Sequence, residues 1–455
     1  MHIYVNFVHI HFDSFLKLMK RVLFKVIFLI IICSLHSCMP YRIIRYWTPD
    51  IDEYAAFPQE AINRGDSVFS FPYKTDSITE SILLYRIKAG DTTLVTLDDY
   101  LKTSTTTSFI IIQNDTIRFE KYYNGYGPGN ISTFFSTTKS VTSLLVGIAV
   151  DEGHIGSIHD VVTDYIPELK NADPSFQKLT IEHLLNMQAG FDFDESYSNP
   201  FKDMARLFYG RNQFKQLSKL KFICDPGSES DYNSATTALL GIVLERAVKQ
   251  PYTSYLQEKV WKPLGMEYDA SMCLDDKKHR SAKSYHGLSA TAIDLAKIGR
   301  LYLNHGNWDG KQIVSKNWIE KSTTPNIEAD RFGYKYKGYQ YNWYNIRSFF
   351  YDSLGHFRQF RDSLSARNFA DSLELADYKV WKIKNKKEKE KDYSAKYYWE
   401  VTQYHPQYHT LGIMNQILYV DPERKIIIVR LGKDSSDNIN QFLMFKLSKK
   451  YPLIK

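Results

Sequence analysis

The sequence predicts an α+β fold in which strands from both ends of a 455-residue chain join one antiparallel sheet flanked by helices. Near the beginning, a β-branched run at 108–113 and an alternating run at 116–123 flank an Asn-Asp turn, which is typical of a hairpin. Near the end, strand-like runs at 410–420 and 425–431 flank a turn at 421–424. Helical periodicity dominates between these pairs, which predicts a mostly helical subdomain there.

Four helices account for that periodicity. The first, 136–152, has apolar residues three and four positions apart and ends before Gly153. The second, 180–187, begins with a threonine cap. The third and fourth cover 234–249 and 291–304, and each carries small or apolar residues on one face.

A charged segment at 346–400 interrupts this pattern. It carries Arg, Asp, Ser and Leu repeats and then a lysine-rich run, which predicts a solvated, helical insertion. The net charge of +7 is concentrated in part between Lys382 and Lys396. The excess charge therefore describes no basic face, and we expect no nucleic-acid partner.

The beginning of the chain, 1–38, has the features of an export signal. Basic residues at 20–21 precede an apolar stretch, 26–35, that is too short to span a bilayer. The stretch ends in Leu-His-Ser-Cys, which resembles a bacterial lipobox and implies lipidation of Cys38. We therefore expect a membrane attachment through this lipid, on the periplasmic or outer side of a bacterial cell envelope. A plain secretory signal or an uncleaved anchor is the alternative, and 39–105 would form a tether and an N-terminal element.

The cysteines give no sign of a metal or redox site. Four are present, none in a CxxC spacing, and two of them lie in the leader. The other two, Cys224 and Cys273, either pair in an oxidising compartment or remain free thiols. We expect no metal and no cofactor.

The candidate chemistry begins at Ser136 and Lys139, an S-x-x-K pair at the start of the first helix. Residues three apart share a helix face, so the hydroxyl and the amine can meet. A partly desolvated lysine can be neutral and accept the serine proton. On its own the pair is equally typical of a capping serine beside an exposed lysine. A second motif, Tyr232-Asn233-Ser234, follows a Pro-Gly turn, and a tyrosine near a lysine can share the role of general base.

Together these motifs resemble the β-lactamase-related serine hydrolases, a family that includes class C β-lactamases, D-Ala-D-Ala carboxypeptidases, EstB-type esterases and 6-aminohexanoate-dimer hydrolases. The resemblance implies a β-lactamase/transpeptidase-like fold over 106–455. It also implies that Ser136 is the acylated nucleophile, Lys139 its base partner, and Tyr232 a second base or leaving-group acid. The matching segments are 134–155, 179–193, 226–245, 255–266, 285–315 and 411–432.

The third motif of that family departs from its usual form. The corresponding strand, 409–416, has no lysine, and its Gly412 follows an apolar residue. The resemblance implies an oxyanion hole of the Ser136 and Ile413 N–H groups, and substrate contacts from Ser234, His286 and Gly412. His286 is equally well interpreted as a turn histidine. His409 is either a surrogate cation or a surface residue at the strand end.

These expectations point to a serine hydrolase that cleaves an ester or amide bond of a small molecule or peptide through an acyl-enzyme. Without the family's lysine, a substrate carboxylate gains no ion pair, so β-lactam hydrolysis is not favoured. The alternative is a catalytically weak, penicillin-binding-like module that binds or senses the cell wall.

Overall fold

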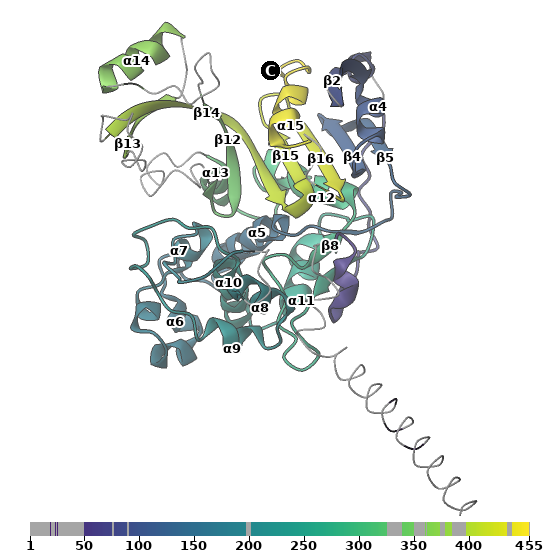
Figure 1. Ribbon diagram of the computed structural model, residues 1–455. Helices are drawn as coiled ribbons and strands as arrows, with labels where there is room; N and C mark the ends of the chain where they lie inside the picture. Colours follow the sequence, from purple (N-terminus) through teal and green to yellow (C-terminus); the bar gives the residue numbers. More distant parts are fainter. Residues whose placement is uncertain are drawn as a thin grey trace, which may run out of the picture.

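The computed structural model describes residues 50–74, 77–88, 91–196, 202–324, 339–349, 362–373, 378–384, 397–434 and 439–454, with the single residues 19, 23, 25 and 360. Two parts are visible in Figure 1: a twisted sheet with its covering helices above, and a cluster of helices below. The first helix after the opening hairpin, α5 (Thr137–Asp151), runs between the two parts.

The main sheet is antiparallel and unites both ends of the chain, as predicted. Its strand order is β11-β12-β14-β15-β16-β4-β5, and β13 pairs with β14. The hairpin β4–β5 therefore lies beside β16 from the other end of the chain. The strands are β4 (Thr106–Gln113), β5 (Thr116–Tyr122), β11 (Tyr339–Gln340), β12 (Trp343–Phe349), β13 (Tyr378–Lys384), β14 (Tyr397–Gly412), β15 (Gln416–Asp421) and β16 (Ile426–Gly432).

The predicted single strand at 410–420 is wrong, because the chain leaves the strand after Gly412. Residues Ile413–Asn415 form a short 3-10 turn, in which Met414 and Asn415 both have a positive φ, at 63° and 57°. Such left-handed residues cannot continue a strand. The buried guanidinium of Arg430 donates hydrogen bonds to the carbonyl oxygens of both residues and so holds the turn.

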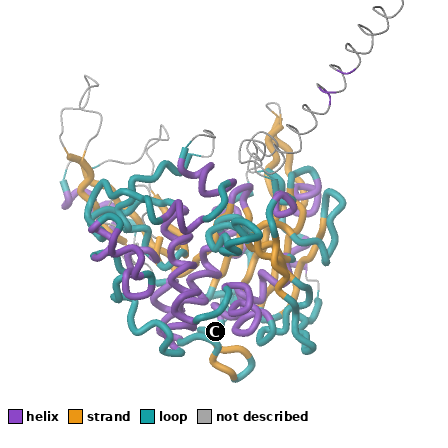
Figure 2. Tube along the Cα trace, turned by 90° about the horizontal axis from the view of Figure 1, so that it is seen from below, coloured by secondary structure: helices purple, strands orange, loops and turns teal. Residues whose placement is uncertain are grey.

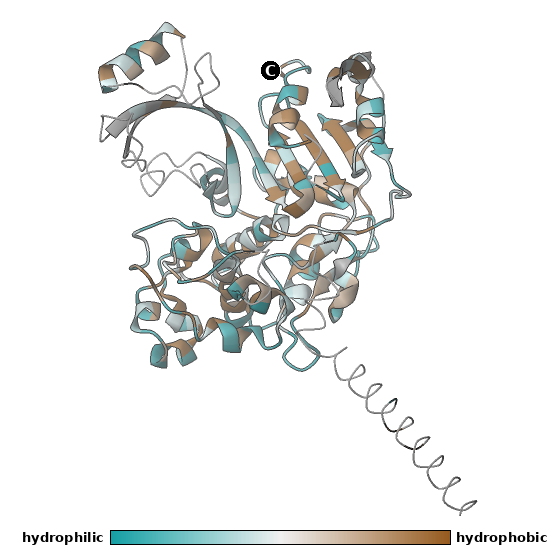
Figure 3. Ribbon diagram, viewed as in Figure 1, coloured by the Kyte–Doolittle hydropathy of each residue, from teal (hydrophilic) through white to brown (hydrophobic). Residues whose placement is uncertain are grey.

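Helices cover both faces of the sheet. Helix α12 (Ala292–Leu303) packs on β15 and β16, where Gly299 allows an approach so close that a Cβ there would lie 2.8 Å from Ile427 and Leu418. The opposite face is covered by α4 (Leu97–Lys102) and α15 (Gln441–Ser448). The strands between these helices are hydrophobic along most of their length (Figure 3).

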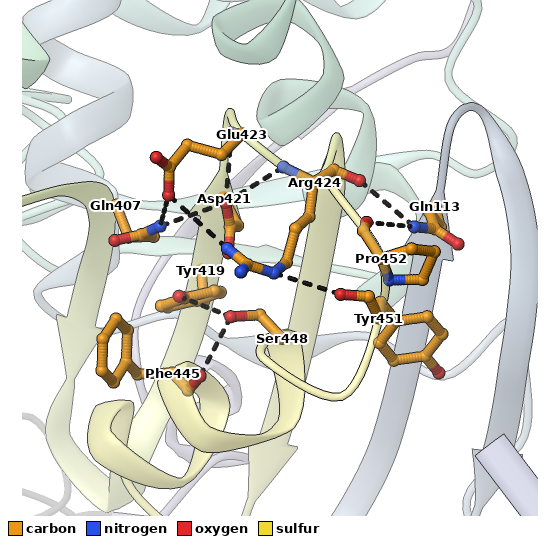
Figure 4. A network of polar contacts seen from close by, with 10 residues as sticks. All are labelled: Gln113, Gln407, Tyr419, Asp421, Glu423, Arg424, Phe445, Ser448, Tyr451 and Pro452. Atoms are coloured by element: carbon orange, nitrogen blue, oxygen red, sulfur yellow. Dashed lines mark hydrogen bonds and ion pairs between the residues drawn. The ribbon is translucent and has the colours of Figure 1, made fainter. Parts of the chain in front are cut away.

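A polar network fastens the end of the chain to the β15–β16 turn (Figure 4). Asp421 accepts hydrogen bonds from the backbone N–H groups of Glu423 and Arg424 and from the Gln407 amide. Arg424 donates to the Tyr451 carbonyl at 3.1 Å. This network caps the edge of the turn far along β14 from Gly412, so it supports the sheet and not the candidate site.

The helical part confirms the predicted helices at 136–152, 180–187 and 234–249. In the view from below, helices gather in the middle of the molecule (Figure 2). The core of this part is α5, whose residues 137–149 are all buried. The other helices of this part are α6 (Val162–Tyr165), α7 (Ile181–Leu185), α8 (Asp203–Tyr209), α9 (Gln213–Leu217), α10 (Ser234–Val248) and α11 (Tyr252–Leu256). Helix α13 (Lys316–Thr323) lies beside β11 and β12 of the main sheet.

The region expected to be a tether and N-terminal element takes part in the fold where it is described. Strand β1 (Gln59–Ile62) pairs with β7 (Ala270–Cys273) in a second sheet of order β1-β7-β8-β6. The remaining strands of that sheet are β6 (Ser132–Thr133) and β8 (Leu288–Ala290). Two small hairpins complete the described strands: β2 (Leu83–Lys88) with β3 (Asp91–Thr96), and β9 (Asn307–Trp308) with β10 (Lys311–Gln312).

The described residues of the insertion at 346–400 do not form the one solvated helix that its charge predicts, and most of its lysine-rich run, 385–396, lies outside them. The described residues form parts of β12 and β14, all of β13 and one helix, α14 (Ser363–Ser372). Strand β13, Tyr-Lys-Val-Trp-Lys-Ile-Lys, contains the β-branched and aromatic residues that favour strands, and it pairs along its whole length with β14. The insertion therefore extends the main sheet, with α14 packed on it.

Apart from residues 19, 23 and 25, the predicted leader lies outside the described residues, and so does Cys38. Within the described part of the chain, no helix has the length and apolar character needed to cross a membrane. Cys224 and Cys273 are both free thiols, so the alternative of a disulfide between them is not adopted.

Candidate active site

The turn into α5 presents Ser136. Phe135, the residue before it, is buried and has a φ of +47°, a left-handed conformation that bulky side chains rarely adopt. Such strain persists only where the surroundings enforce it, and here Phe134 donates to the Leu288 carbonyl at 2.8 Å. As a result Ser136 is partly exposed at the N-terminus of a helix whose next residues are all buried. The positive end of the helix dipole therefore lies at the Ser136 backbone.

Lys139, one turn further along α5, points back to Ser136. Its side chain is 1% exposed, and its Nζ lies 3.0 Å from Ser136 Oγ. The same Nζ lies 3.2 Å from Ser234 Oγ and 3.0 Å from the Tyr285 carbonyl oxygen. The three partners come from α5, from the start of α10 and from the loop before β8. Hydroxyl and carbonyl oxygens thus surround this amine at hydrogen-bond distance.

Burial lowers the pKa of Lys139 from 10.5 to about 8, while the negative charge of Glu195 acts in the opposite direction. Desolvation penalises the charged ammonium more than the neutral amine, which is why burial has this sign. A lysine with a pKa near 8 has a measurable neutral fraction at neutral pH. It can therefore accept a proton from a hydroxyl at 3.0 Å.

Tyr232 is half-buried beside this pair. The centre of its ring is 5.0 Å from Lys139 Nζ, and its ring contacts Tyr339 edge-to-face with the centroids 5.8 Å apart. Tyr339 belongs to β11 and is buried, so the insertion side of the sheet reaches the site here.

Ser234 is held by a residue that the sequence reasoning missed. Glu195 accepts the Ser234 N–H at 2.8 Å with one carboxylate oxygen and the Ser234 O–H at 2.7 Å with the other. No motif spacing links Glu195 to Ser234, because the loop after α7 brings the carboxylate to α10 through tertiary structure. The signal in the sequence is only a short acidic run, Asp192-Phe193-Asp194-Glu195.

The end of β14 lies directly against the turn before Ser136. A Cβ at Gly412 would lie 2.2 Å from the Phe134 carbonyl oxygen, so only glycine fits there. Thr137 Oγ1 also contacts Thr410 Oγ1 and the Gln416 carbonyl, both at 3.0 Å. These contacts bring Ile413, the residue after Gly412, beside the start of α5. The Ser136 N–H donates no hydrogen bond to any described residue, so it is available to an oxyanion.

Two histidines are buried. His286 is 4% exposed and stacks on Phe208 with the ring centroids 4.1 Å apart. Burial lowers its pKa well below 6.5, so it is neutral, and its substrate contact stays a prediction. His409 is also 4% exposed, and burial lowers its pKa to about 3. Both alternatives for His409 are therefore wrong, since it is neither a cation nor a surface residue.

One cluster among the described residues has ligand atoms close enough to hold a metal ion: Asp275, Asp276 and His279. Its carboxylates already accept hydrogen bonds, from the Gln213 and Ser281 N–H groups and from His279 itself. None of its members contacts Ser136, Lys139 or Ser234. The cluster has the character of a loop-fastening network.

A sheet built from both chain ends, with a Ser-x-x-Lys pair at the start of a central buried helix, defines a β-lactamase/transpeptidase-like fold. A family model described as beta-lactamase matches residues 103–438. The chain therefore belongs to the beta-lactamase family of serine hydrolases, as the motifs predicted.

Individual proteins resemble the chain more distantly. The 6-aminohexanoate-dimer hydrolase of Paenarthrobacter ureafaciens is 29% identical over 257 residues, which make up 54% of this chain and 64% of that protein. Protein flp of Staphylococcus aureus (strain COL) is 25% identical over 203 residues, 41% of this chain and 39% of that protein. The chain thus spans less than two thirds of the length of these curated relatives.

Solved structures share the fold. One provisionally described as a 6-aminohexanoate-dimer hydrolase, from Bacillus anthracis, has a TM-score of 0.64 at 21% identity, with 90% of this chain and 92% of that chain covered. EstCE1, a hydrolase with promiscuous acyltransferase activity, has a TM-score of 0.52 at 13% identity, with 77% and 94% covered.

Proposed function

We propose that this protein is a serine hydrolase that cleaves ester or uncharged amide bonds through an acyl-enzyme on Ser136. One observation carries the proposal: a fully buried lysine with a lowered pKa lies 3.0 Å from the hydroxyl of a serine at a helix N-terminus. A capping serine beside an exposed lysine, the alternative interpretation of the motif, would not have this geometry.

The reaction follows from the positions of these groups. Neutral Lys139 accepts the Ser136 hydroxyl proton while Oγ forms a bond to the carbonyl carbon of the substrate. The resulting oxyanion binds the N–H groups of Ser136 and Ile413. The tetrahedral intermediate then breaks its bond to the leaving group, which receives a proton from Lys139 or Tyr232. Water repeats the sequence on the acyl-enzyme, with the same groups as bases, and releases the acid.

The substrate class rests on the charges that line the end of β14. His409 is neutral, and Arg430, although buried nearby, donates to the carbonyls of Met414 and Asn415. A substrate carboxylate at this edge would have to be desolvated against neutral groups, which costs binding energy. Short esters and uncharged amides avoid that cost.

The direct test is covalent labelling of the full chain with a fluorophosphonate, followed by intact-mass and peptide analysis. We expect one adduct, on the peptide that contains Ser136, and none in Ser136→Ala. Ser143→Ala is the matched control, because Ser143 lies in the same helix and its hydroxyl has no hydrogen-bond partner among the described residues. An adduct that persists at an equal rate in Ser136→Ala would overturn the proposal. Failure of the wild type to label would favour the binding module instead.

Attachment through a lipid on Cys38, on the periplasmic or outer side of the envelope, belongs to the same proposal. The support is the leader sequence alone. Metabolic labelling with a fatty-acid analogue in a bacterial host should tag the wild type, and Cys38→Ser should lose the tag. A wild type that is released untagged would reduce the leader to an ordinary secretory signal.

A further inference from the structure

Glu195 contacts neither Ser136 nor Lys139, yet it can affect both residues through its hydrogen bonds with Ser234. Its two carboxylate oxygens accept the N–H and the O–H of Ser234, the first residue of α10. An ionised carboxylate is only an acceptor, so the Ser234 hydroxyl proton points at Glu195. Ser234 Oγ can then only accept from Lys139, whose Nζ is 3.2 Å away.

The second partner of Lys139 has the same polarity. The Tyr285 carbonyl oxygen, 3.0 Å from Nζ, is an acceptor by its chemistry. A neutral lysine amine has two N–H groups and one lone pair. When Ser234 and Tyr285 take the two N–H groups, the lone pair is left for the third neighbour, Ser136 Oγ, at 3.0 Å. That is the orientation in which Lys139 can remove the Ser136 proton.

We propose that Glu195 is a positioning residue that fixes the direction of the hydrogen bonds around Lys139 and so aims the lone pair of the neutral amine at Ser136. The inference rests on the proposed function. Without the carboxylate, the Ser234 hydroxyl is free to turn and donate to the Lys139 nitrogen. The lone pair would then be occupied by Ser234, and Ser136 would lose its base for part of the time.

The charge of Glu195 adds a second, measurable effect. It raises the pKa of Lys139 against the lowering by burial, so removing the charge should lower that pKa further. Among the described residues, the other titratable groups near Lys139 are Tyr232, Tyr285, His286 and, next to Glu195, Tyr339; Lys283 lies beyond Tyr285 and His286. His286 is neutral because its pKa is well below 6.5, and Tyr285 donates its hydroxyl to the Leu207 carbonyl. Burial keeps Tyr339 protonated by raising its pKa.

The test compares Glu195→Gln with the wild type in the rate of acylation by p-nitrophenyl butyrate, measured from the burst of p-nitrophenol between about pH 6 and 10. Because glutamine can donate to Ser234 Oγ, we expect acylation on the high-pH plateau to fall by about 10²-fold, the scale of a misaligned general base. The pH at half-maximal rate should also move to lower values. Asp194→Asn is the matched control, because this neighbouring carboxylate contacts Lys202 and the Ser196 N–H; it should leave both quantities unchanged.

Two further variants separate positioning from support of the fold. Glu195→Asp keeps the charge, so its pH midpoint should stay close to that of the wild type even where the rate falls. Ser234→Ala removes the group through which Glu195 acts, so Glu195→Gln should cost little more in that background. A Glu195→Gln enzyme that is slower by the same factor at every pH, with additive losses in the double variant, would overturn the inference. A wild type that forms no Ser136 adduct would instead refute the proposed function.

Discussion

Two buried lysines in this molecule have opposite surroundings. Lys297, in α12, is fully buried, with Nζ 3.4 Å from a carboxylate oxygen of Asp294 and 3.4 Å from one of Glu267. It also donates to the Gly265 carbonyl at 2.8 Å. Lys139, in α5, is buried to the same degree, but the atoms at hydrogen-bond distance from its Nζ are two hydroxyls and one carbonyl oxygen.

The comparison shows how burial alone does not decide what a lysine does. Burial lowers the pKa of both amines, and at Lys297 two carboxylates at 3.4 Å from Nζ oppose that effect and form ion pairs with the amine. The Glu195 carboxylate does not contact Lys139 but accepts a hydrogen bond from Ser234, which lies next to Lys139. Burial lowers the pKa of Lys139 to about 8. The first lysine is therefore a structural cation, and the second is poised to exchange a proton.

The largest expected effect comes from exchanging each lysine for methionine. Lys139→Met should lower the rate of Ser136 acylation by about 10⁴-fold or more, since the nucleophile loses its base. Its stability should change little, because relief of the buried amine's desolvation offsets the hydrogen bonds lost by Ser234 and Tyr285. The measurements are fluorophosphonate labelling rates and urea unfolding.

Lys297→Met should show the reverse pattern. It leaves Asp294 as a buried carboxylate without its cation, which typically costs about 3–5 kcal/mol of unfolding free energy. The folded fraction should still label on Ser136 at the rate of the wild type. Equal losses of activity and stability in both variants would remove the distinction between the two lysines.

A second prediction sharpens the Lys139 side of the comparison. Tyr232→Phe should slow acylation by about 10²–10⁴-fold, because the phenol can relay protons beside the amine 5.0 Å from its ring. Combined with Lys139→Ala, the losses should be far from additive, as expected of groups that act as one unit. Single and double variants are compared by burst kinetics. Additive losses would mean that the two residues work separately.

The pH dependence of acylation and of stability gives a third way to test the difference between Lys139 and Lys297. Acylation should rise about tenfold per pH unit below about 8 and level off above it, as Lys139 becomes neutral. Its folded-state pKa is lower than the ordinary 10.5, so between these values the unfolded chain binds more protons than the native one. From this group the unfolding free energy should therefore increase as the pH rises through that window, by on the order of 3 kcal/mol. Lys139→Met should remove that increment, as urea titrations at several pH values would show.

How much of the fold and of the site could be predicted from the sequence depends on whether the interactions join residues that are near or far apart along the chain. The helices α5 and α10 and the hairpin β4–β5 were predictable, because their periodicity, caps and turns are local. The pair Ser136–Lys139 was predictable for the same reason, being one helical turn apart. The break in the strand after Gly412 was not, since it depends on Arg430 from the neighbouring strand.

The insertion and Glu195 show two further limits. Lysine density in 382–396 suggested a solvated helix, although 378–384 also contains the β-branched and aromatic residues typical of a strand, so charge was weighed above strand propensity. Glu195 acts on α10 across a loop, and no pattern in one sequence encodes that contact. The local pair Ser136–Lys139 could therefore be predicted from the sequence, and the long-range contact of Glu195 with Ser234 could not.

The smallest predicted effect concerns substrate preference. It depends on whether the edge of the site holds a fixed cation of the kind that Lys297 is in α12. The neutral His409 and the Arg430 guanidinium, which binds backbone carbonyls, predict that it does not. We expect kcat/KM for p-nitrophenyl butyrate to exceed that for nitrocefin by at least about tenfold, which corresponds to about 1.4 kcal/mol of transition-state binding. Both substrates are measured on one preparation, with Ser136→Ala as the blank.

A preference for nitrocefin of the same size would show that a positive charge does reach the carboxylate of the substrate. Arg347 would then be the first residue to replace, because its charge already acts on His409 and lowers that pKa. Arg347→Gln should in that case abolish the preference and leave ester hydrolysis intact, whereas an Arg430→Gln enzyme would lose both, since the turn that carries Ile413 depends on the guanidinium. A tenfold preference for the ester would instead agree with the absence of a fixed cation at this edge, and Lys139 would then act on the Ser136 proton and not on a substrate carboxylate.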